Sequence, residues 1–339
     1  LDDRDEAEVL AQRLLEVIGE PITVGASVVQ QRASVGVVIF DQSHGDVGEV
    51  IQNVDAALYE AKSHGRGHHV VFTPSMHQRA VSRFSLAQEL RGALGTNQIS
   101  MHYQPIADLS TGKVVGFEAL MRWHHPERGW VPPSVFIPLA EQSDLIVELG
   151  VFALREAVRE ARSWEGDPDH LPYVTVNFSA RQFLTPGLVD TIRDMLDDAG
   201  VAPHRLVVEI TEGVALLDIN ETEVILHELS RLGVGIALDD FGMGYSSLSY
   251  LPKLNPRIIK IDQSFVRPAT DDSRNDLLLE SIISLGQRLN MTMLAEGIET
   301  RVQFHRLRRM GCELGQGYLF SPAVPTPEAG ALVGQVFGD

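Results

Sequence analysis

The chain has 339 residues, 44% of them hydrophobic, which excludes a disordered protein and suffices for one large domain or two smaller ones. Its 28 Lys and Arg against 46 Asp and Glu give a formal net charge of −18, which argues against a binder of nucleic-acid polymers. The single cysteine, Cys312, excludes an intrachain disulfide framework and a multi-cysteine zinc site.

Residues 1–75 show the pattern helix, strand, strand, helix, strand. Apolar residues recur on one helical face over Glu6–Val17 and again over Val50–Lys62, which predicts two amphipathic helices. The apolar segments Pro21–Gly25 and Ala33–Phe40 are typical of strands. We therefore expect a small α+β unit at the start of the chain.

Residues 76–98 are predicted to form a linker helix, and residues 99–339 a second, larger domain. Apolar strands alternate there with helices such as Pro186–Ala199, Glu221–Leu232 and Asn275–Leu289. The candidate strands are Ile99–Ile106, Val114–Met121, Tyr173–Phe178, Arg205–Ile210, Gly235–Leu238, Arg257–Ile261, Met291–Ala295 and Leu314–Leu319. Eight strands over about 240 residues favour an α/β (β/α)8 TIM-like barrel. A doubly wound sheet has a similar alternation, but no glycine-rich first turn is present.

Charged or amide side chains follow or end most of these strands. On six strands they are Glu118, Asn177, Glu209, Asp239, Asp240, Lys260 and Glu296, and Gln316 lies within the last strand. A single acid after a strand is often a helix N-cap, but six strands that end this way indicate a shared site at one rim of the barrel. Such carboxylates repel one another unless cations are present, and oxygen ligands without His or Cys favour Mg²⁺ or Mn²⁺.

The adjacent pair Asp239 and Asp240 is suited to bridging or flanking two metal ions. Two ions about 3.5–4 Å apart activate a water and hold both oxygens of an in-line phosphoryl displacement. The residues themselves therefore predict metal-assisted phosphodiester hydrolysis.

Residues 85–339 resemble the EAL domain, the family of cyclic di-GMP phosphodiesterases. The family takes its name from Glu118-Ala119-Leu120, which alone is unspecific. Further motifs follow in the family's order: Val176-Asn177-Phe178-Ser179, Glu209-Ile210-Thr211-Glu212, Asp239-Asp240-Phe241-Gly242, Lys260-Ile261-Asp262, Ala295-Glu296-Gly297 and Gln316-Gly317-Tyr318. The full ordered set makes the resemblance specific, and it implies hydrolysis of cyclic di-GMP to linear pGpG.

The resemblance implies two Mg²⁺ or Mn²⁺ ions in the site. Their ligands would be Glu118, Asn177, Glu209 and Asp239 for the first ion, and Asp239 with Asp240 for the second. The catalytic residues would be Lys260, Glu296 and Glu118, with Lys260 activating the nucleophilic water. Metal-bound waters or the lysine would be fixed by Glu296 and Gln316. The dinucleotide would be bound by Gln104, Arg122 and Asp262, with the Arg122 guanidinium at a phosphate.

Glu212 would anchor the loop after Asp240, which in this family links substrate binding to a dimer interface. The fourth residue of that loop is Met243, where the family has a small residue. This longer, flexible side chain bears on the order of the loop and on the rate of hydrolysis, and not on the metal ligands. We expect a homodimer formed through the EAL domain.

Residues 1–75 resemble the C-terminal half of a GGDEF domain, through motifs such as Asp55-Ala56-Ala57-Leu58-Tyr59 and Gly65-Arg66-Gly67. The GTP-binding half of that family is absent, so this chain is not expected to synthesise cyclic di-GMP. The chain begins with Leu1 and is expected to be part of a longer protein. No apolar run approaches the ~20 residues of a membrane span, so we expect a cytoplasmic location and no membrane contact from this segment, although a preceding part could be anchored.

Two alternatives to the phosphodiesterase stay open. The chain could be a non-catalytic receptor that binds cyclic di-GMP and signals to a partner, an interpretation that only Met243 supports. It could also be a metal phosphoesterase with another substrate, if Arg122 and Gln104 prove irrelevant to binding.

Overall fold

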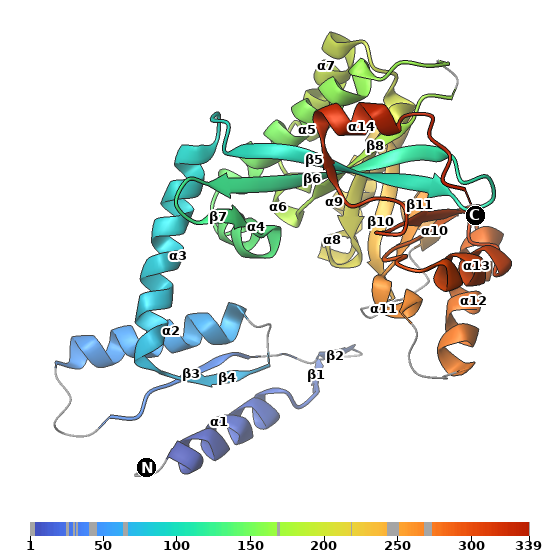
Figure 1. Cartoon of the computed structure of the whole chain (residues 1–339). Coiled ribbons are helices and arrows are strands. Elements are labelled where there is room, and N and C mark those ends of the chain that lie inside the picture. The colour runs from blue at the N-terminus through green and yellow to red at the C-terminus, as the bar shows by residue number, and fades with distance from the viewer. Residues whose placement is uncertain are drawn as a thin grey trace. The chain divides into compact units, whose positions relative to one another are not determined.

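The protein is described by a computed structural model covering residues 4–24, 27–29, 31, 33–40, 46–63, 67–167, 170–217, 219–242, 251–267 and 273–338. The chain divides into two compact units, Leu1–Glu89 and Leu90–Asp339, and the boundary falls within helix α3 (Pro74–Ala93) (Figure 1). The linker helix expected within residues 76–98 is therefore present; it begins slightly earlier, at Pro74, where proline is well tolerated, and ends at Ala93.

The first unit pairs two short sheets with helices. Its elements are α1 (Arg4–Ile18), β1 (Ile22–Val24), β2 (Ser27–Val29), β3 (Val35–Val37), α2 (Val47–Ser63) and β4 (His69–Val71). Strands β1 and β2 are antiparallel, whereas β3 and β4 are parallel. At Gly36 an added Cβ would lie 2.5 Å from the backbone nitrogen of Leu58, so glycine is needed for the close approach of β3 to α2. The predicted helices and strands are found, and β2 was not predicted.

The second unit is a closed barrel of eight strands. They are β5 (Ile99–Asp108), β6 (Val114–His125), β8 (Tyr173–Phe178), β9 (Leu206–Thr211), β10 (Gly235–Phe241), β11 (Ile258–Ile261), β12 (Thr292–Ala295) and β13 (Leu314–Gln316). The order around the barrel is β5-β13-β12-β11-β10-β9-β8-β6, and β6 returns to β5. The predicted (β/α)8 barrel is confirmed. One feature differs from a uniform barrel, because β5 runs antiparallel to both of its neighbours.

Helices surround this barrel (Figure 1), and two short strands, β7 (Gly129–Val131) and β14 (Val324–Pro325), extend its sheet. The helices are α4 (Pro133–Glu141), α5 (Leu145–Ser163), α6 (Ala180–Phe183), α7 (Leu188–Ala199), α8 (Glu212–Leu217), α9 (Ile219–Leu232), α10 (Leu251–Leu254), α11 (Gln263–Val266), α12 (Ser273–Arg288), α13 (Arg301–Arg309) and α14 (Thr326–Leu332), with a 3-10 turn at Pro203–Arg205. Capping boxes at Ser179 and Thr300 fix where α6 and α13 begin.

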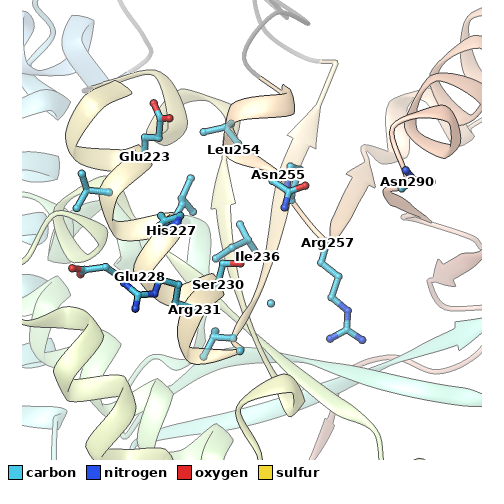
Figure 2. A pocket seen from close by; sticks show the side chains of 16 residues that line it. Glu223, His227, Glu228, Ser230, Arg231, Ile236, Leu254, Asn255, Arg257 and Asn290 are labelled. Atoms are coloured by element: carbon cyan, nitrogen blue, oxygen red, sulfur yellow. The ribbon is translucent and has the colours of Figure 1, made fainter.

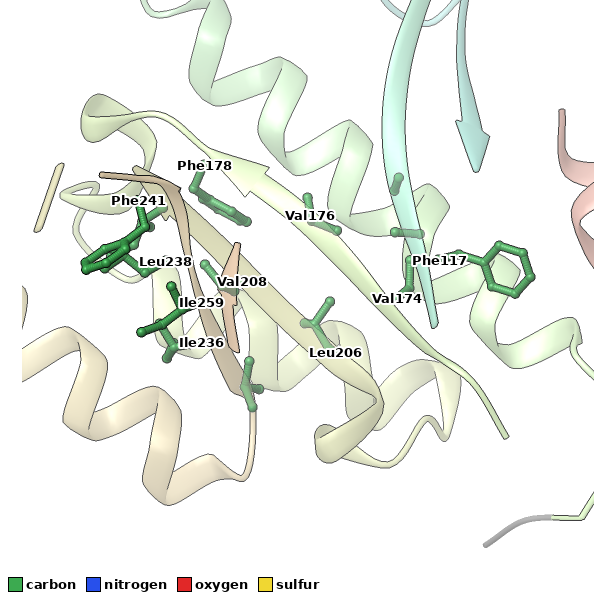
Figure 3. Packing of buried hydrophobic residues seen from close by; sticks show 14 of the residues in the cluster. Phe117, Val174, Val176, Phe178, Leu206, Val208, Ile236, Leu238, Phe241 and Ile259 are labelled. Carbon is green, nitrogen blue, oxygen red and sulfur yellow. The ribbon is translucent and has the colours of Figure 1, made fainter. Parts of the chain in front are cut away.

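Alternate residues of the strands form two separate apolar clusters. One lies between strands and helices and includes Phe117, Val174, Val176, Leu206, Val208, Ile236 and Ile259 (Figure 3). The other, which we call the floor, fills the barrel interior with Ile106, Tyr173, Val207, Ala237, Ile258, Leu294 and Leu314. Side chains of a strand alternate between its two faces, so a residue two positions after a floor residue also points into the barrel.

The floor is closed by the ring of Tyr173. Gly116 of β6 pairs with Tyr173 of β8, and a Cβ at Gly116 would lie 2.6 Å from this ring, so glycine makes room for it. The guanidinium of Arg257, just before β11, lies over the same ring at 5.3 Å from its centroid. The floor therefore separates the strands' carboxyl-end interior from the opposite end of the barrel.

Candidate active site

Polar side chains lie directly above the floor, each two residues further along its strand. Glu209 follows Val207, Asp239 follows Ala237, Lys260 follows Ile258, Glu296 follows Leu294 and Gln316 follows Leu314. This spacing of two is the reason that the polar residues meet inside the barrel. We call this layer the upper layer.

Lys260 is the centre of the upper layer. Its Nζ lies 2.7 Å from Glu296 Oε1, 2.9 Å from Glu209 Oε2, 3.3 Å from Asp239 Oδ1 and 3.5 Å from Glu118 Oε2. Lys260 is 1% exposed, so these ion pairs are shielded from solvent. Burial alone lowers the pKa of Lys260, but the surrounding carboxylates, Glu118 and Glu209 first, raise this pKa well above its ordinary value.

The carboxylates differ in how well they are compensated. Burial works to raise the pKa of Glu118, yet the charge of Lys260 and hydrogen bonds from Gln316 and Asn177 lower this pKa below its ordinary value. Burial raises the pKa of Glu209 well above its ordinary value despite Lys260. Burial likewise raises the pKa of Glu296 to about 7, with repulsion from neighbouring carboxylates adding to the effect.

An amide network holds Glu118 on the other side of the layer. Asn177 Nδ2 donates to Glu118 Oε1 at 2.7 Å, and Gln316 Nε2 donates to Glu118 Oε2 at 2.7 Å. Gln316 Nε2 also donates to Gln104 Oε1 at 2.9 Å, while Gln104 Nε2 donates to the carbonyl of Ser321 at 3.2 Å. Since these residues lie on β5, β6, β8 and β13, the network joins the strands around the point where the barrel closes.

The donors fit hard divalent cations by their chemistry. Four carboxylates lie within 3.5 Å of the Lys260 Nζ. A fifth belongs to Asp240, whose backbone N–H donates to Asp239 Oδ1 at 2.9 Å. Burial and repulsion from Asp239 and Asp262 raise the pKa of Asp240 as well, so negative charge is left uncompensated. Among the described residues, no three His, Cys, Asp or Glu side chains form a preformed metal cage, and the carboxylates close on Lys260 instead.

Three described residues among those predicted stand outside the hydrogen bonds and ion pairs given above. Arg122 Nη1 donates to the carbonyl of Met121 at 3.0 Å, and the Asp262 carboxylate caps α11 by accepting from the backbone N–H of Ser264 at 2.9 Å. Glu212 is buried at the start of α8. Met243 lies outside the described residues.

A cavity of about 310 Å³ opens onto the upper layer. Besides four predicted residues, it is lined by Leu120, Gln263, Arg267, Gly297, Glu299, Gly317 and Tyr318. Arg267 Nη2 lies 3.7 Å from Glu299 Oε1, and Tyr318 is 72% exposed. No role was predicted for these residues from the sequence. All but Leu120 follow β11, β12 or β13 within a few positions. Extending the search from the strand ends into the loops that follow them would therefore have identified these residues.

A larger hollow, of about 890 Å³, lies at the amino-terminal ends of β10 and β11 (Figure 2). Side chains of α9 such as Glu223, His227 and Arg231 line it, together with Asn255, Arg257 and Asn290. It holds none of the upper-layer carboxylates. The candidate active site is therefore distinguished by its carboxylates and not by the volume of its cavity.

Sequence comparison places these motifs in a known family. Residues 87–323 match the EAL domain, which is more than half of the chain. The chain belongs to the EAL domain family. Residues 1–68 match the diguanylate cyclase GGDEF domain, so a partial GGDEF segment precedes the EAL domain. Both predicted resemblances are confirmed.

Two similar proteins support this assignment. The chain is 39% identical over 329 residues to the bifunctional diguanylate cyclase/cyclic di-GMP phosphodiesterase MucR of Pseudomonas aeruginosa, covering 97% of this chain and 48% of MucR. It is 38% identical over 320 residues to the cyclic di-GMP phosphodiesterase NbdA of the same organism, covering 94% and 41%. The chain thus spans about half or less of the length of these relatives.

A solved EAL domain structure is also similar. The structure described as the MucR phosphodiesterase in complex with cyclic di-GMP superposes with a TM-score of 0.69 at 41% identity. The match covers 72% of this chain and 99% of that one.

In the described part of the chain, no helix is both long and apolar enough to cross a membrane.

Proposed function

We propose that the EAL domain hydrolyses cyclic di-GMP to linear pGpG with two Mg²⁺ or Mn²⁺ ions. The observation that carries the proposal is the buried Lys260 with four carboxylates within 3.5 Å of its Nζ, at the carboxyl-end interior of the barrel. The names of MucR and NbdA, and the ligand named for the solved MucR structure, support the substrate.

The proposed cation ligands are Glu118, Asn177, Glu209, Asp239 and Asp240. When bound, the ions supply an activated water and balance the charge that develops on the phosphoryl oxygens. The protein contributes the frame: Lys260 holds Glu209 and Glu296 in place at 2.9 and 2.7 Å, and Gln316 with Asn177 fixes both oxygens of Glu118. Such preorganised groups need no rearrangement at the moment of reaction.

The proposed reaction breaks one P–O3′ bond of the cyclic dinucleotide. Lys260 would contact and help activate the attacking water. The water oxygen bonds to phosphorus, and its proton passes to a base near Lys260. Glu296 suits that task, because burial raises its pKa to about 7 and so brings it near neutral pH. The 3′ oxygen leaves and takes a proton from solvent, to which Glu296 returns the proton that it accepted, and the linear product results.

The cavity beside the upper layer is the proposed place for the dinucleotide. Gln104 lines it, and we propose that Arg122 and Asp262 also contact the substrate. The planar Arg122 guanidinium matches two oxygens of one phosphate. Hydrolysis of cyclic di-GMP alongside simple phosphodiesters would test this assignment, since Arg122→Ala should affect only the dinucleotide.

Incubation with cyclic di-GMP and Mn²⁺, followed by chromatography of the products, tests the function. We expect pGpG from the unaltered protein and none from Glu118→Ala. Glu223→Ala, which removes an exposed glutamate of α9 that lines the larger hollow, is the matched control and should keep full activity. Tight binding of cyclic di-GMP without turnover in Mn²⁺ would contradict the proposal and favour the receptor.

We also propose the domain limits 1–75, 76–98 and 99–339, a homodimer through the EAL domain and a cytoplasmic location. Glu212, buried at the start of α8, is the proposed anchor of the loop after Asp240, and Met243 belongs to that loop. Light scattering coupled to size exclusion tests the dimer, with monomer at all concentrations as the contradicting result.

A further inference from the structure

The inward face of β8 carries three polar residues in succession: Tyr173, Thr175 and Asn177. Tyr173 belongs to the floor, and Asn177 binds Glu118 through its amide. Thr175 lies between them, is 0% exposed and has no role in the function proposed above. A buried hydroxyl at the base of a charged layer needs a hydrogen-bond partner.

The neighbouring strands leave one partner for this hydroxyl. Thr175 pairs in register with Glu118 on β6 and with Val207 on β9, so Glu209, two residues after Val207, is its diagonal neighbour. Both oxygens of Glu118 already accept from Asn177 and Gln316. Val207 offers no polar side-chain atom. Glu209 is therefore the carboxylate on which the Thr175 hydroxyl can act.

The two oxygens of Glu209 are in different situations. Oε2 accepts from Lys260 Nζ at 2.9 Å, whereas Oε1 is buried and has no hydrogen-bond partner among the described residues. Thr175 Oγ1 is also buried and without a partner in the described part of the chain. Burial has the largest effect on the Glu209 carboxyl and raises its pKa, while the neighbouring Thr175 hydroxyl acts in the opposite direction and lowers this pKa.

We propose that Thr175 is a positioning residue whose hydroxyl donates to Glu209 Oε1 and so keeps Oε2 turned toward Lys260 and the cation site. The inference rests on the proposed function, because Glu209 is a cation ligand only within it. A carboxylate held at one oxygen loses the freedom to rotate its other oxygen away from its partners. Groups that orient a metal ligand in this way typically change metal affinity 10–100-fold when removed.

Two substitutions separate the hydroxyl from the packing of its side chain. Thr175→Val keeps nearly the same shape and removes the hydroxyl, while Thr175→Ser keeps the hydroxyl and removes a methyl group. We expect calorimetric titration with Mn²⁺, in the absence of substrate, to show about 10-fold weaker binding to Thr175→Val. Thr175→Ser should bind Mn²⁺ within about twofold of the unaltered protein, by the same reasoning.

Kinetics supply a second readout. In Thr175→Val, we expect the Mn²⁺ concentration for half-maximal rate to rise by about the same 10-fold, with an unchanged KM for cyclic di-GMP at saturating Mn²⁺. Tyr173→Phe is the matched control, because it removes another buried hydroxyl from the same face of β8, within the floor. It should bind Mn²⁺ like the unaltered protein. Circular dichroism of each variant checks that the barrel is folded.

Three results would overturn the inference. Equal Mn²⁺ affinity in Thr175→Val and the unaltered protein would show that the hydroxyl does not position Glu209. Equally weak binding in Thr175→Ser and Thr175→Val would assign the effect to packing. If the unaltered protein itself neither binds Mn²⁺ nor turns over cyclic di-GMP, the proposed function fails and the role of Thr175 fails with it, which distinguishes that case from the first two.

Discussion

The floor and the upper layer occupy the same barrel and differ by two residues along each strand. The floor is apolar apart from the Tyr173 hydroxyl, whereas the upper layer places one ammonium among carboxylates. Because side chains alternate along each strand, residues two positions apart both point into the barrel, so the two layers differ only in the types of their side chains. In barrels of this class, the carboxyl end holds the chemistry and the opposite end contributes stability. Activity and stability should therefore respond to different substitutions.

Glu209→Gln gives the largest expected effect. The neutral amide keeps the shape but loses a proposed cation ligand, so we expect kcat to fall about 10³-fold, which corresponds to about 4 kcal/mol of transition-state stabilisation. Because burial already raises the pKa of Glu209, its charge is unfavourable in the fold, and we expect little loss of thermal stability. Rate assays and melting curves check both parts. A large drop in melting temperature would contradict the expectation that the upper layer governs activity and not stability.

Ile258→Ala, one step below Lys260, should act in the opposite way. Ile258 is 1% exposed in the floor, so the truncation leaves a cavity and should lower the free energy of unfolding by about 2–4 kcal/mol. We expect the rate per folded molecule to stay within about twofold, since the upper layer keeps its charges. Urea unfolding and active-site titration measure the two quantities. Loss of activity in a fully folded variant would contradict the separation.

Metal affinity should depend on pH through the upper layer alone. Burial raises the pKa of Glu296 to about 7, so below pH 7 this carboxyl takes up a proton and the cation site loses a neighbouring negative charge. We expect Mn²⁺ to bind up to about 10-fold more weakly for each pH unit below 7, with protons released on binding. Titrations at pH 5.5, 6.5 and 7.5 in buffers of different ionisation enthalpy measure this. An affinity independent of pH would contradict the assignment.

Arg257→Ala should give the smallest effect. Its guanidinium lies 5.3 Å from the Tyr173 ring centroid and donates to the carbonyl of His204 at 3.0 Å, beneath the floor. At this exposed position, a cation–π contact contributes about 0.5–1 kcal/mol to stability. We expect a loss of that size in chemical denaturation and an unchanged rate. A rate change would show that the floor does not insulate the upper layer from the opposite end.

The barrel and its site were predictable to different extents. Apolar strands followed by acids predicted the barrel and predicted that the acids meet at one rim. Glu118, Glu209, Asp239 and Glu296 do lie together around Lys260, because side-chain alternation and strand direction determine where side chains meet. The reversed direction of β5 was not predicted, since the residue pattern of a strand does not encode its direction.

Finer features of the site depend on three-dimensional contacts. The strand pattern predicts that Lys260 shares a site with the acids, but it does not indicate that four carboxylates lie within 3.5 Å of its Nζ. Thr175 has the composition of an ordinary strand residue, and only its register beside Glu118 and Val207 reveals its neighbours. Arg267 and Tyr318 follow β11 and β13, so their position after strand ends could have indicated them, whereas periodicity gives no guidance outside the strands.

The pairing of the first barrel strand with the last has a consequence for synthesis of the protein. Strand β5 pairs with β6 through a short turn, but it also pairs with β13, and Gln104 meets Gln316 across 212 positions of sequence. The ring of strands therefore stays open on the ribosome until the last of them has emerged. Pairing over such distances makes folding slow, and Glu118 gains its Gln316 donor only when nearly the whole barrel has been translated.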